Sequence, residues 1–116
     1  MNVEKDQIFI GQVDDIELDS VEEFEHEEES YAIYNLSSGF YATQGYCFCG
    51  EGAQLSEGIL KNEEIKCQSC GKVFSIVSGD CVSNPETQGL RVYDVVTEGN
   101  DLYLNIWNKL IILNKD

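Results

Sequence analysis

Residues 47–75 read CFCGEGAQLSEGILKNEEIKCQSCGKVFS and hold four of the five cysteines of this 116-residue chain. The cysteines form two close pairs, Cys47-Phe48-Cys49 and Cys67-Gln68-Ser69-Cys70, and a glycine follows each pair. A metal needs several thiolates at about 2.3 Å, and one tight turn can direct two sulfurs and its own backbone N–H groups to a common point. Glycine permits such a turn. The spacing therefore predicts two loops that share one metal centre.

The segment between the two pairs, residues 50–66, is long enough for the chain to leave the first loop and return with the second. We therefore expect the loops to meet tip to tip and to place Cys47, Cys49, Cys67 and Cys70 around the metal. Zinc sites prefer two-residue spacers in both pairs, which only the second pair has. The spacing alone leaves zinc and iron open.

The fifth cysteine, Cys81, has no partner in either loop. An odd count leaves one thiol over in a disulfide framework, whereas a reducing compartment keeps thiols free for metal. The count therefore favours metal ligation over disulfides. We expect Cys81 to be a small free thiol that is buried or half-buried.

Outside the cysteine loops, short apolar runs of β type recur between turn-forming residues. They are residues 8–13, 31–35, 40–43, 72–76, 91–96 and 102–107. Turn residues at 37–39, 78–80 and 98–101 lie between such runs, where hairpins can close. The glutamate-rich residues 14–29 are interpreted as strand and loop on an exposed edge, where charge discourages edge-to-edge pairing. The sequence thus predicts an antiparallel all-β protein.

The composition indicates one folded domain over residues 1–116, with 42% hydrophobic and 25% charged residues. The 22 acidic and 7 basic side chains give a net charge of -15. This charge repels nucleic-acid phosphates and anionic lipid, and it speeds encounter with a basic protein surface. No apolar stretch approaches the roughly 18 residues that span a bilayer, and the N-terminus lacks a signal-peptide pattern. We expect a cytoplasmic protein without nucleic-acid or membrane partners.

An enzyme is not indicated. The sequence offers no recognisable pair of nucleophile and base, no glycine-rich phosphate loop and no histidine near the cysteine loops. The only histidine, His26, lies in the acidic segment. The chain is therefore expected to act as a component of a system whose catalysis belongs to a partner.

The sequence resembles the soluble Rieske-type ferredoxins, especially those related to rhizopine catabolism, over residues 8–106. The matching segments are 31–34 and 39–43 before the first loop, 50–58 after it, 64–67 entering the second loop, and 71–75 with 78–79 after it. In that family a Cys-x-His loop and a Cys-x-x-His loop each give one cysteine and one histidine to a 2Fe-2S cluster. Here Cys49 and Cys70 stand at the two histidine positions.

The resemblance implies an all-β, Rieske-like antiparallel sandwich or barrel with a small inserted cluster-binding subdomain at about residues 45–76. It implies an electron-transfer ferredoxin with a 2Fe-2S cluster on Cys47, Cys49, Cys67 and Cys70. Such a carrier passes single electrons from a flavoprotein reductase to an oxygenase or another redox enzyme, which it would meet through its acidic surface. Four thiolates make the centre more negative than two thiolates and two imidazoles, so a low reduction potential is expected.

The alternative is a zinc-binding β module that acts as a structural or regulatory interaction subunit, because four thiolates also suit zinc. For the iron cluster, the resemblance implies that Cys47 and Cys67 hold the inner iron and that Cys49 and Cys70 lie on the iron nearer to solvent. Four aromatic residues lie close to the loops in sequence: Tyr41, Tyr46, Phe48 and Phe74. We expect Phe74 to pack in the core and Phe48 to give the centre an apolar cover. Trp107 and residues 110–113 are expected to close the last strand or to meet a neighbouring chain.

Overall fold

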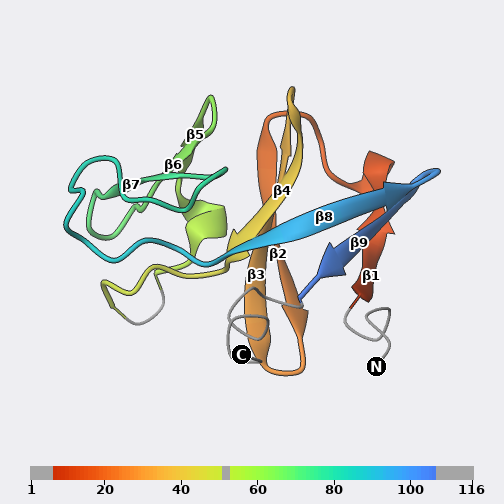
Figure 1. The fold of residues 1–116 in the computed structure, drawn as a ribbon, viewed down its shortest axis with the longest axis horizontal. Coiled ribbons are helices and arrows are strands. Elements are labelled where there is room, and N and C mark those ends of the chain that lie inside the picture. Colours follow the sequence, from red (N-terminus) through yellow and green to blue (C-terminus); the bar gives the residue numbers. More distant parts are fainter. Residues whose placement is uncertain (1–6, 51–52, 107–116) are drawn as a thin grey trace, which may run out of the picture.

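The computed structural model describes residues 7–50 and 53–106, which form two antiparallel sheets (Figure 1). The large sheet has six strands in the order β1-β9-β8-β4-β3-β2. They are β1 (Gln7–Gln12), β2 (Ser20–His26), β3 (Glu29–Leu36), β4 (Gly39–Gln44), β8 (Val92–Glu98) and β9 (Asp101–Asn105). The small sheet has the order β5-β6-β7, with β5 (Ile59–Lys61), β6 (Glu64–Lys66) and β7 (Val73–Ser75).

Helical structure in the described residues is limited to two 3-10 turns, η2 (Val13–Asp15) and η3 (Leu55–Glu57). Within residues 7–50 and 53–106 no helix is long and apolar enough to cross a membrane.

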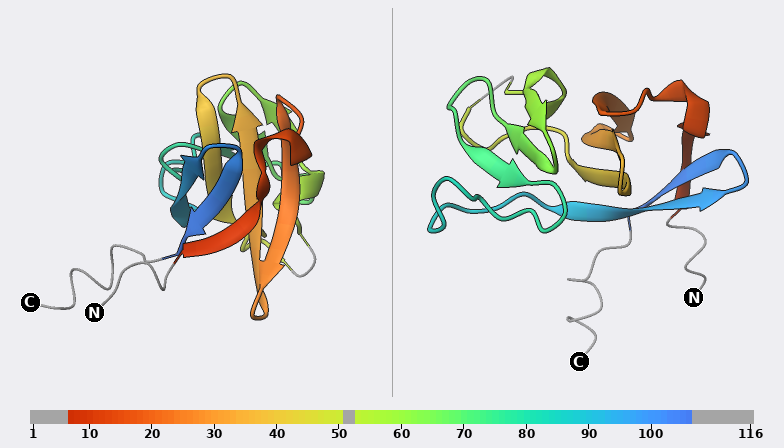
Figure 2. Two further views of the ribbon diagram at one scale, coloured as in Figure 1. Left: turned by 90° about the vertical axis from the view of Figure 1, so that its right-hand side faces the viewer. Right: turned by 90° about the horizontal axis from the view of Figure 1, so that it is seen from above.

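The large sheet curls on itself, as the two views of Figure 2 show. One apolar core lies within this curl and includes Tyr31, Ile33, Leu102 and Leu104. Successive strand residues point to opposite faces, so the intervening residues of β3 face the other way. Tyr34 and its neighbours on that face belong to a second core. Strand β3 is thus buried on both faces, which explains its continuous apolar run.

Residues 45–90, here called the insert, join β4 to β8 and contain the small sheet. The second core joins the insert to β3. Its buried members from the insert are Cys47, Ala53, Leu55, Ile65, Cys67, Phe74, Ile76, Cys81 and Leu90. Because residues of β3 and of the insert share this core, the insert packs directly on the large sheet.

The all-β prediction is confirmed. The expected strands at 8–13, 31–35, 40–43, 72–76, 91–96 and 102–107 correspond to β1, β3, β4, β7, β8 and β9. Trp107 and residues 110–113 lie outside the described residues. The acidic residues 14–29 contain η2 and β2, and β2 is an edge strand, as expected. Turns at 37–39 and 98–101 close the β3–β4 and β8–β9 hairpins.

The expected hairpin at 78–80 is only partly correct. The turn exists, with the Gly79 N–H donating to the Ser75 carbonyl at 2.8 Å. Beyond it the chain makes one isolated bridge, between Phe74 and Cys81, and no strand until β8. Pro85 lies in this stretch and has no N–H to donate, which disfavours a paired strand there. Strand β5 was not expected, because three residues are too few to show an alternating pattern.

Candidate metal centre

The sulfur atoms of Cys47, Cys49, Cys67 and Cys70 all lie within 4.8 Å of one another. The Sγ–Sγ distance is 3.8 Å between Cys47 and Cys70 and 3.6 Å between Cys49 and Cys67. All five cysteines are free thiols. The two loops therefore meet at their tips, as the spacing predicted, and the four predicted residues are brought together without disulfides.

The second loop is the connection between β6 and β7, which pair in register through Lys66 and Val73. Two short backbone hydrogen bonds close it. The Cys67 N–H donates to the Lys72 carbonyl at 2.8 Å, and the Gly71 N–H donates to the Cys67 carbonyl at 2.8 Å. Gly71 has a φ of +82°, a conformation that costs glycine little. This loop is a self-contained turn at a hairpin tip.

The first loop begins where β4 ends. The Cys47 N–H donates to the Ala53 carbonyl at 2.8 Å, and the Leu55 N–H donates to the Gly45 carbonyl at 2.9 Å. The side-chain amide of Gln44 donates to the Tyr46 carbonyl at 2.7 Å. This loop is therefore held both by the returning chain of the insert and by the last residue of β4.

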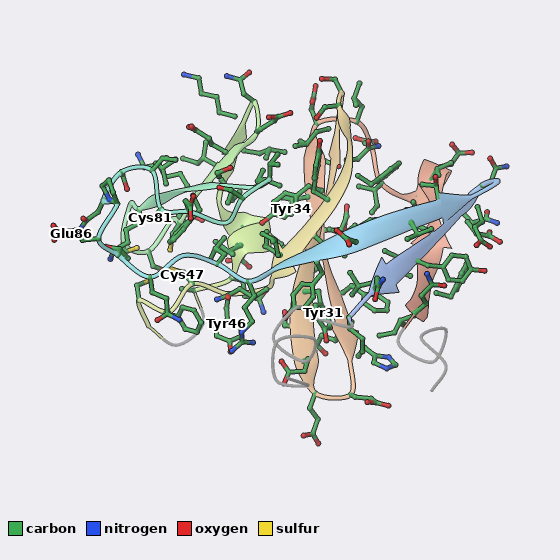
Figure 3. The ribbon with its side chains drawn as sticks, in the orientation of Figure 1. Tyr31, Tyr34, Tyr46, Cys47, Cys81 and Glu86 are labelled. Atoms are coloured by element: carbon green, nitrogen blue, oxygen red, sulfur yellow. The ribbon has the colours of Figure 1, made fainter. Side chains whose placement is uncertain are left out.

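Each loop supplies one buried and one exposed sulfur. Cys47 and Cys67 are 2% and 1% exposed, whereas Cys49 and Cys70 are exposed. Figure 3 places Cys47 in the insert, at the end of the molecule away from β1 and β9. The buried pair lies in the second core. This arrangement agrees with the expected division into inner and outer residues.

The aromatic residues near the loops fall into two groups. Phe74 is 2% exposed and packs in the second core, as expected. Tyr46 and Phe48 are exposed, and their rings contact edge to face with centroids 5.9 Å apart. Tyr41 packs against the second core, and its hydroxyl lies 2.8 Å from that of Ser38. Phe48 is thus an exposed residue of the first loop that contacts Tyr46 and lines a small pocket with Cys47 and Cys49.

The local environment moves the thiol pKa values in opposite directions. Burial raises the pKa of Cys47 to about 12, with the Cys49 backbone N–H acting against this rise. Burial also raises the pKa of Cys70, but hydrogen bonds from the Lys72 backbone N–H and from neighbouring thiols outweigh it and bring it to about 7. A metal binds the thiolate. Cys70 therefore offers a thiolate near neutral pH, whereas Cys47 loses its proton on binding.

The donor set contains sulfur only. His26 lies on β2, and its Nε2 is 3.6 Å from a carboxylate oxygen of Glu27. It does not belong to the four-residue group. Cys81 is buried, and its sulfur lies 3.6 Å from the Ser83 hydroxyl. It is a buried free thiol outside the group, as expected.

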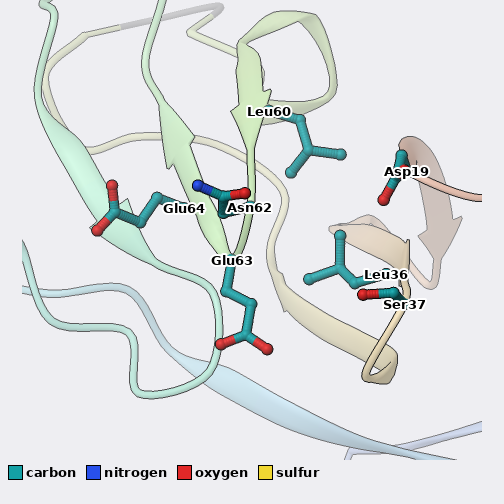
Figure 4. A pocket seen from close by; sticks show the side chains of 7 residues that line it. All are labelled: Asp19, Leu36, Ser37, Leu60, Asn62, Glu63 and Glu64. Carbon is teal, nitrogen blue, oxygen red and sulfur yellow. The ribbon is translucent and has the colours of Figure 1, made fainter.

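Among the pockets in or beside the insert, two differ in their relation to the cysteines. The first has a volume of about 760 Å³ and lies where the β5–β6 turn approaches Asp19 and the β3–β4 turn (Figure 4). Its lining residues are Asp19, Leu36, Ser37, Leu60, Asn62, Glu63 and Glu64, so no cysteine faces it. The second, of about 150 Å³, is lined by Cys47, Phe48, Cys49, Lys72, Phe74, Thr87 and Gln88. The second pocket adjoins the cysteine group, and the first does not.

Two residues of the first loop's support were not anticipated from the sequence. Gln44 is 3% exposed, although glutamine is usually a surface residue. Gly45 passes so close to β3 that a Cβ there would meet the Ser30 hydroxyl and lie 2.7 Å from the Ser30 carbonyl carbon. For Gly45 the sequence offered one signal, a glycine between the apolar run of β4 and Cys47. For Gln44 nothing in the sequence indicated burial.

Sequence comparison connects this geometry to known proteins. The chain is 28% identical over 93 residues to the biphenyl dioxygenase ferredoxin subunit of Pseudomonas sp. (strain KKS102), which covers 80% of this chain and 85% of that protein. It is 30% identical over 80 residues to the ferredoxin component of the naphthalene 1,2-dioxygenase system of Pseudomonas aeruginosa, covering 69% and 76%. These relatives are named as ferredoxin components of dioxygenase systems.

Solved structures share the fold. A structure described as the complex of reduced oxygenase and oxidized ferredoxin in carbazole 1,9a-dioxygenase matches with a TM-score of 0.79 and 27% identity, covering 86% of this chain and 93% of that one. The ferredoxin of carbazole 1,9a-dioxygenase from Nocardioides aromaticivorans IC177 matches with a TM-score of 0.77 and 22% identity, covering 84% and 95%. Residues 6–94 match the family model described as Rieske [2Fe-2S] domain. With its curled antiparallel sheets and its two cysteine loops meeting at their tips, this chain belongs to the Rieske domain family.

Proposed function

We propose that this chain is an electron-transfer ferredoxin that carries one 2Fe-2S cluster on Cys47, Cys49, Cys67 and Cys70. The observation that carries the proposal is the group of four free thiols within 4.8 Å, in a chain whose family is described by that cluster. Thiolates are the usual ligands of such clusters, so the donor set fits chemically. When bound, the cluster supplies a one-electron redox centre. Residues 45–76 are the proposed cluster-binding subdomain of a single domain at 1–116.

The chain's own residues have distinct tasks in this proposal. Cys47 and Cys67 anchor the centre in the second core, and Cys49 and Cys70 hold it at the surface, where electrons enter and leave. Hydrogen bonds from backbone N–H groups reach the sulfurs of Cys47 and Cys70. Such bonds partly neutralise thiolate charge and raise the potential. The exposed rings of Tyr46 and Phe48, which contact each other beside the first loop, would limit water there.

The proposed partners are an oxygenase as electron acceptor and a flavoprotein reductase as donor. Support comes from relatives named as dioxygenase ferredoxins and from the similar ferredoxin solved in complex with an oxygenase. Edge strand β2 and its turn carry the exposed residues Glu22, Glu23, Glu25, Glu27 and Glu28, which would attract a basic partner surface. A reducing cytoplasm would keep all five thiols free for this role.

The proposed reduction potential follows from the ligand set. All-cysteine plant-type centres lie near -400 mV, whereas centres with two histidine ligands lie at about -150 to +300 mV. Without an imidazole in the donor set, a potential near the lower value is expected. Its dependence on pH should also be weak, because no ligand imidazole gains or loses a proton.

The test is anaerobic purification of the full chain, followed by analysis of iron and acid-labile sulfide, EPR after dithionite and potentiometry. The expected result is equal iron and sulfide, a signal of a reduced 2Fe-2S centre, and a midpoint near the all-cysteine value. The matched variant is Cys49→His/Cys70→His, which restores the family's ligand types and is expected to raise the midpoint by at least about 250 mV. A positive midpoint for the unaltered chain would contradict the proposal.

One observation favours a second candidate, a site for a single metal ion. Sulfurs at 2.3 Å from one tetrahedral ion lie about 3.8 Å apart, and two of the sulfur pairs here lie at 3.6 and 3.8 Å. Ligands on two bridged irons lie further apart across the cluster. The comparisons lend zinc no support, so metal analysis decides. The purified protein could contain one zinc ion and no sulfide and stay colourless after reconstitution with iron and sulfide. That result would favour a structural zinc module over an electron carrier.

A further inference from the structure

The two buried polar side chains among the described residues are neighbours, Thr43 and Gln44, at the end of β4. Buried polar groups lower stability unless they are hydrogen-bonded. The Thr43 hydroxyl donates to the Gln44 carbonyl at 2.8 Å and lies 2.9 Å from the Tyr34 hydroxyl. The described residues contain no buried side-chain nitrogen or oxygen without a partner. The buried polar side chains therefore lie together where the chain enters the first loop, and each of them is hydrogen-bonded.

The Gln44 side chain uses both ends of its amide. Its Nε2 donates to the Tyr46 carbonyl at 2.7 Å, and its Oε1 accepts from the Arg91 N–H at 2.9 Å. Its backbone N–H also donates to the Arg91 carbonyl at 2.9 Å. A donor at one end and an acceptor at the other allow one orientation of the amide only, because a flipped amide would face like groups at both ends.

These contacts join the two chain segments that connect the insert to the large sheet. Gln44 is the last residue before the insert, and Arg91 is the first residue after it, next to β8. Figure 1 shows the end of β4 beside the start of β8, and the two strands pair through Thr43 and Val92. The Gln44 side chain therefore links the two chain segments at the base of the insert, and it also contacts Tyr46, the residue before Cys47.

Between these contacts the chain has little freedom. The Gly45 N–H donates to the Ser30 carbonyl at 2.8 Å, and there is no room for a Cβ at this position. The Tyr46 carbonyl is held by Gln44, and the Cys47 N–H by Ala53. We propose that Gln44 is a positioning residue for the metal centre, which fixes the Tyr46 carbonyl and thereby keeps the Cys47 sulfur buried and aimed at the other three.

This inference rests on the proposed function only in treating Cys47 as a ligand, so its test uses the folded, metal-free full chain. Cys49→Ser/Cys70→Ser serves as the background, because it removes the two exposed thiols that would otherwise react first. Into it are placed Gln44→Leu, which removes both ends of the amide, and Gln44→Glu, which keeps an acceptor for the Arg91 N–H but no donor. The rate of iodoacetamide labelling is measured for each remaining cysteine by peptide mass spectrometry.

The expected result is that both Gln44 variants raise the labelling rate of Cys47 about tenfold relative to Cys67, the factor that follows from losing one buried hydrogen-bond partner. Cys67 is the internal control, because it is as buried as Cys47 but held by the other loop. Thr43→Val is the matched control variant at the neighbouring buried site, and it should leave the ratio unchanged. Equal rises at Cys47, Cys67 and Cys81 would mean general loosening and would overturn the proposal, as would no rise at all.

A second readout uses the loaded protein. Gln44→Leu is expected to shift the reduction midpoint and broaden the EPR signal, whereas Thr43→Val lowers only the unfolding midpoint. If the midpoint and the EPR signal of the Gln44 variants are unchanged, Gln44 does not position the centre and has only a structural role. If the centre proves to hold no iron, the proposed function fails, but the labelling ratio of Cys47 to Cys67 still decides the role of Gln44.

Discussion

The two cysteine loops bring their sulfurs to one point by different means. The second loop is closed within six residues, by hydrogen bonds among Cys67, Gly71 and Lys72 at the tip of the β6–β7 hairpin. The first loop depends on contacts from elsewhere, namely the Gln44 amide and the close passage of Gly45 over Ser30. The second loop can form together with its own hairpin, whereas the first requires the insert to be seated on the large sheet. Contacts that are distant in sequence form late, because they require loop closure first.

The largest expected effect is loss of the centre itself, and it should be the same for both loops. Cys47→Ser and Cys67→Ser each remove a proposed ligand that is buried, and they are expected to abolish stoichiometric metal binding, because a hydroxyl is a much poorer soft ligand than a thiolate. Metal and sulfide analysis of the purified variants measures this. The control is Cys81→Ser, which lies outside the four-sulfur group and should keep a full complement of metal. Full metal content in either the Cys47 or the Cys67 variant would show that the two loops do not contribute equally to metal binding.

Gly45→Ala tests the dependence of the first loop on the large sheet. The new Cβ would approach the Ser30 carbonyl carbon to 2.7 Å, and since backbone cannot rotate away, the β3 contact must shift. We expect a loss of about 3 kcal/mol in the free energy of unfolding, at the upper end of overpacking effects. Urea denaturation of the metal-free protein measures it.

The control for this variant is Gly50→Ala, also in the first loop, where a Cβ meets nothing within 4 Å. It should change stability by no more than about 0.5 kcal/mol. Equal effects at positions 45 and 50 would show that the first loop is not pressed against β3.

Gly71→Ala tests the second loop, where the cost is conformational and not steric. Gly71 has a φ of +82° and open space around its Cα. An alanine in this left-handed region costs about 1–2 kcal/mol, so the variant should be less damaging than Gly45→Ala. Thermal and urea unfolding give the order. Gly71→Asn is the matched variant, because asparagine tolerates this conformation better, and it should lie between glycine and alanine.

The smallest expected effect concerns the buried hydroxyl beside the first loop's anchor. Tyr34→Phe removes the 2.9 Å contact with Thr43 in the second core, and the loss of one buried hydrogen bond is worth about 1 kcal/mol. Tyr41→Phe is the control, since its hydroxyl contacts Ser38 at an exposed site. Denaturation should show a clear loss for the first variant and almost none for the second. The reverse order would show that the contact between Tyr34 and Thr43 contributes little to the stability of the second core.

The grouping of the four cysteines and the fold class could be inferred from the sequence because their signals are local. Paired cysteines followed by glycines indicate metal loops, and turn residues between short apolar runs indicate hairpins at 37–39 and 98–101. The turn at 78–80 was recognisable for the same reason. Its failure to extend into a paired strand depends on residues 82–90, whose path is set by contacts such as that between Leu90 and Gly79.

The burial of Gln44 and the contacts that support the first loop could not be inferred in the same way. Glutamine is usually a surface residue, and nothing in the sequence near Gln44 indicates burial. Both ends of its amide find hydrogen-bond partners only because the end of β4 lies beside Arg91 in the folded chain. The necessity of glycine at position 45 likewise arises from Ser30, fifteen residues earlier in the chain, across the β3–β4 hairpin. Neither partner is marked by a local pattern, because each contact is created by packing.

What the sequence by itself determined is the chemistry, four thiols and no nearby imidazole, together with the local turn of the second loop, since residue type and short spacing are properties of the chain alone. What only the tertiary structure decided is how the first loop is anchored, that Gln44 is buried with both ends of its amide paired, and that Gly45 has no room for a Cβ. These depend on surfaces that meet after the insert packs on β3, and such surfaces join residues far apart in sequence.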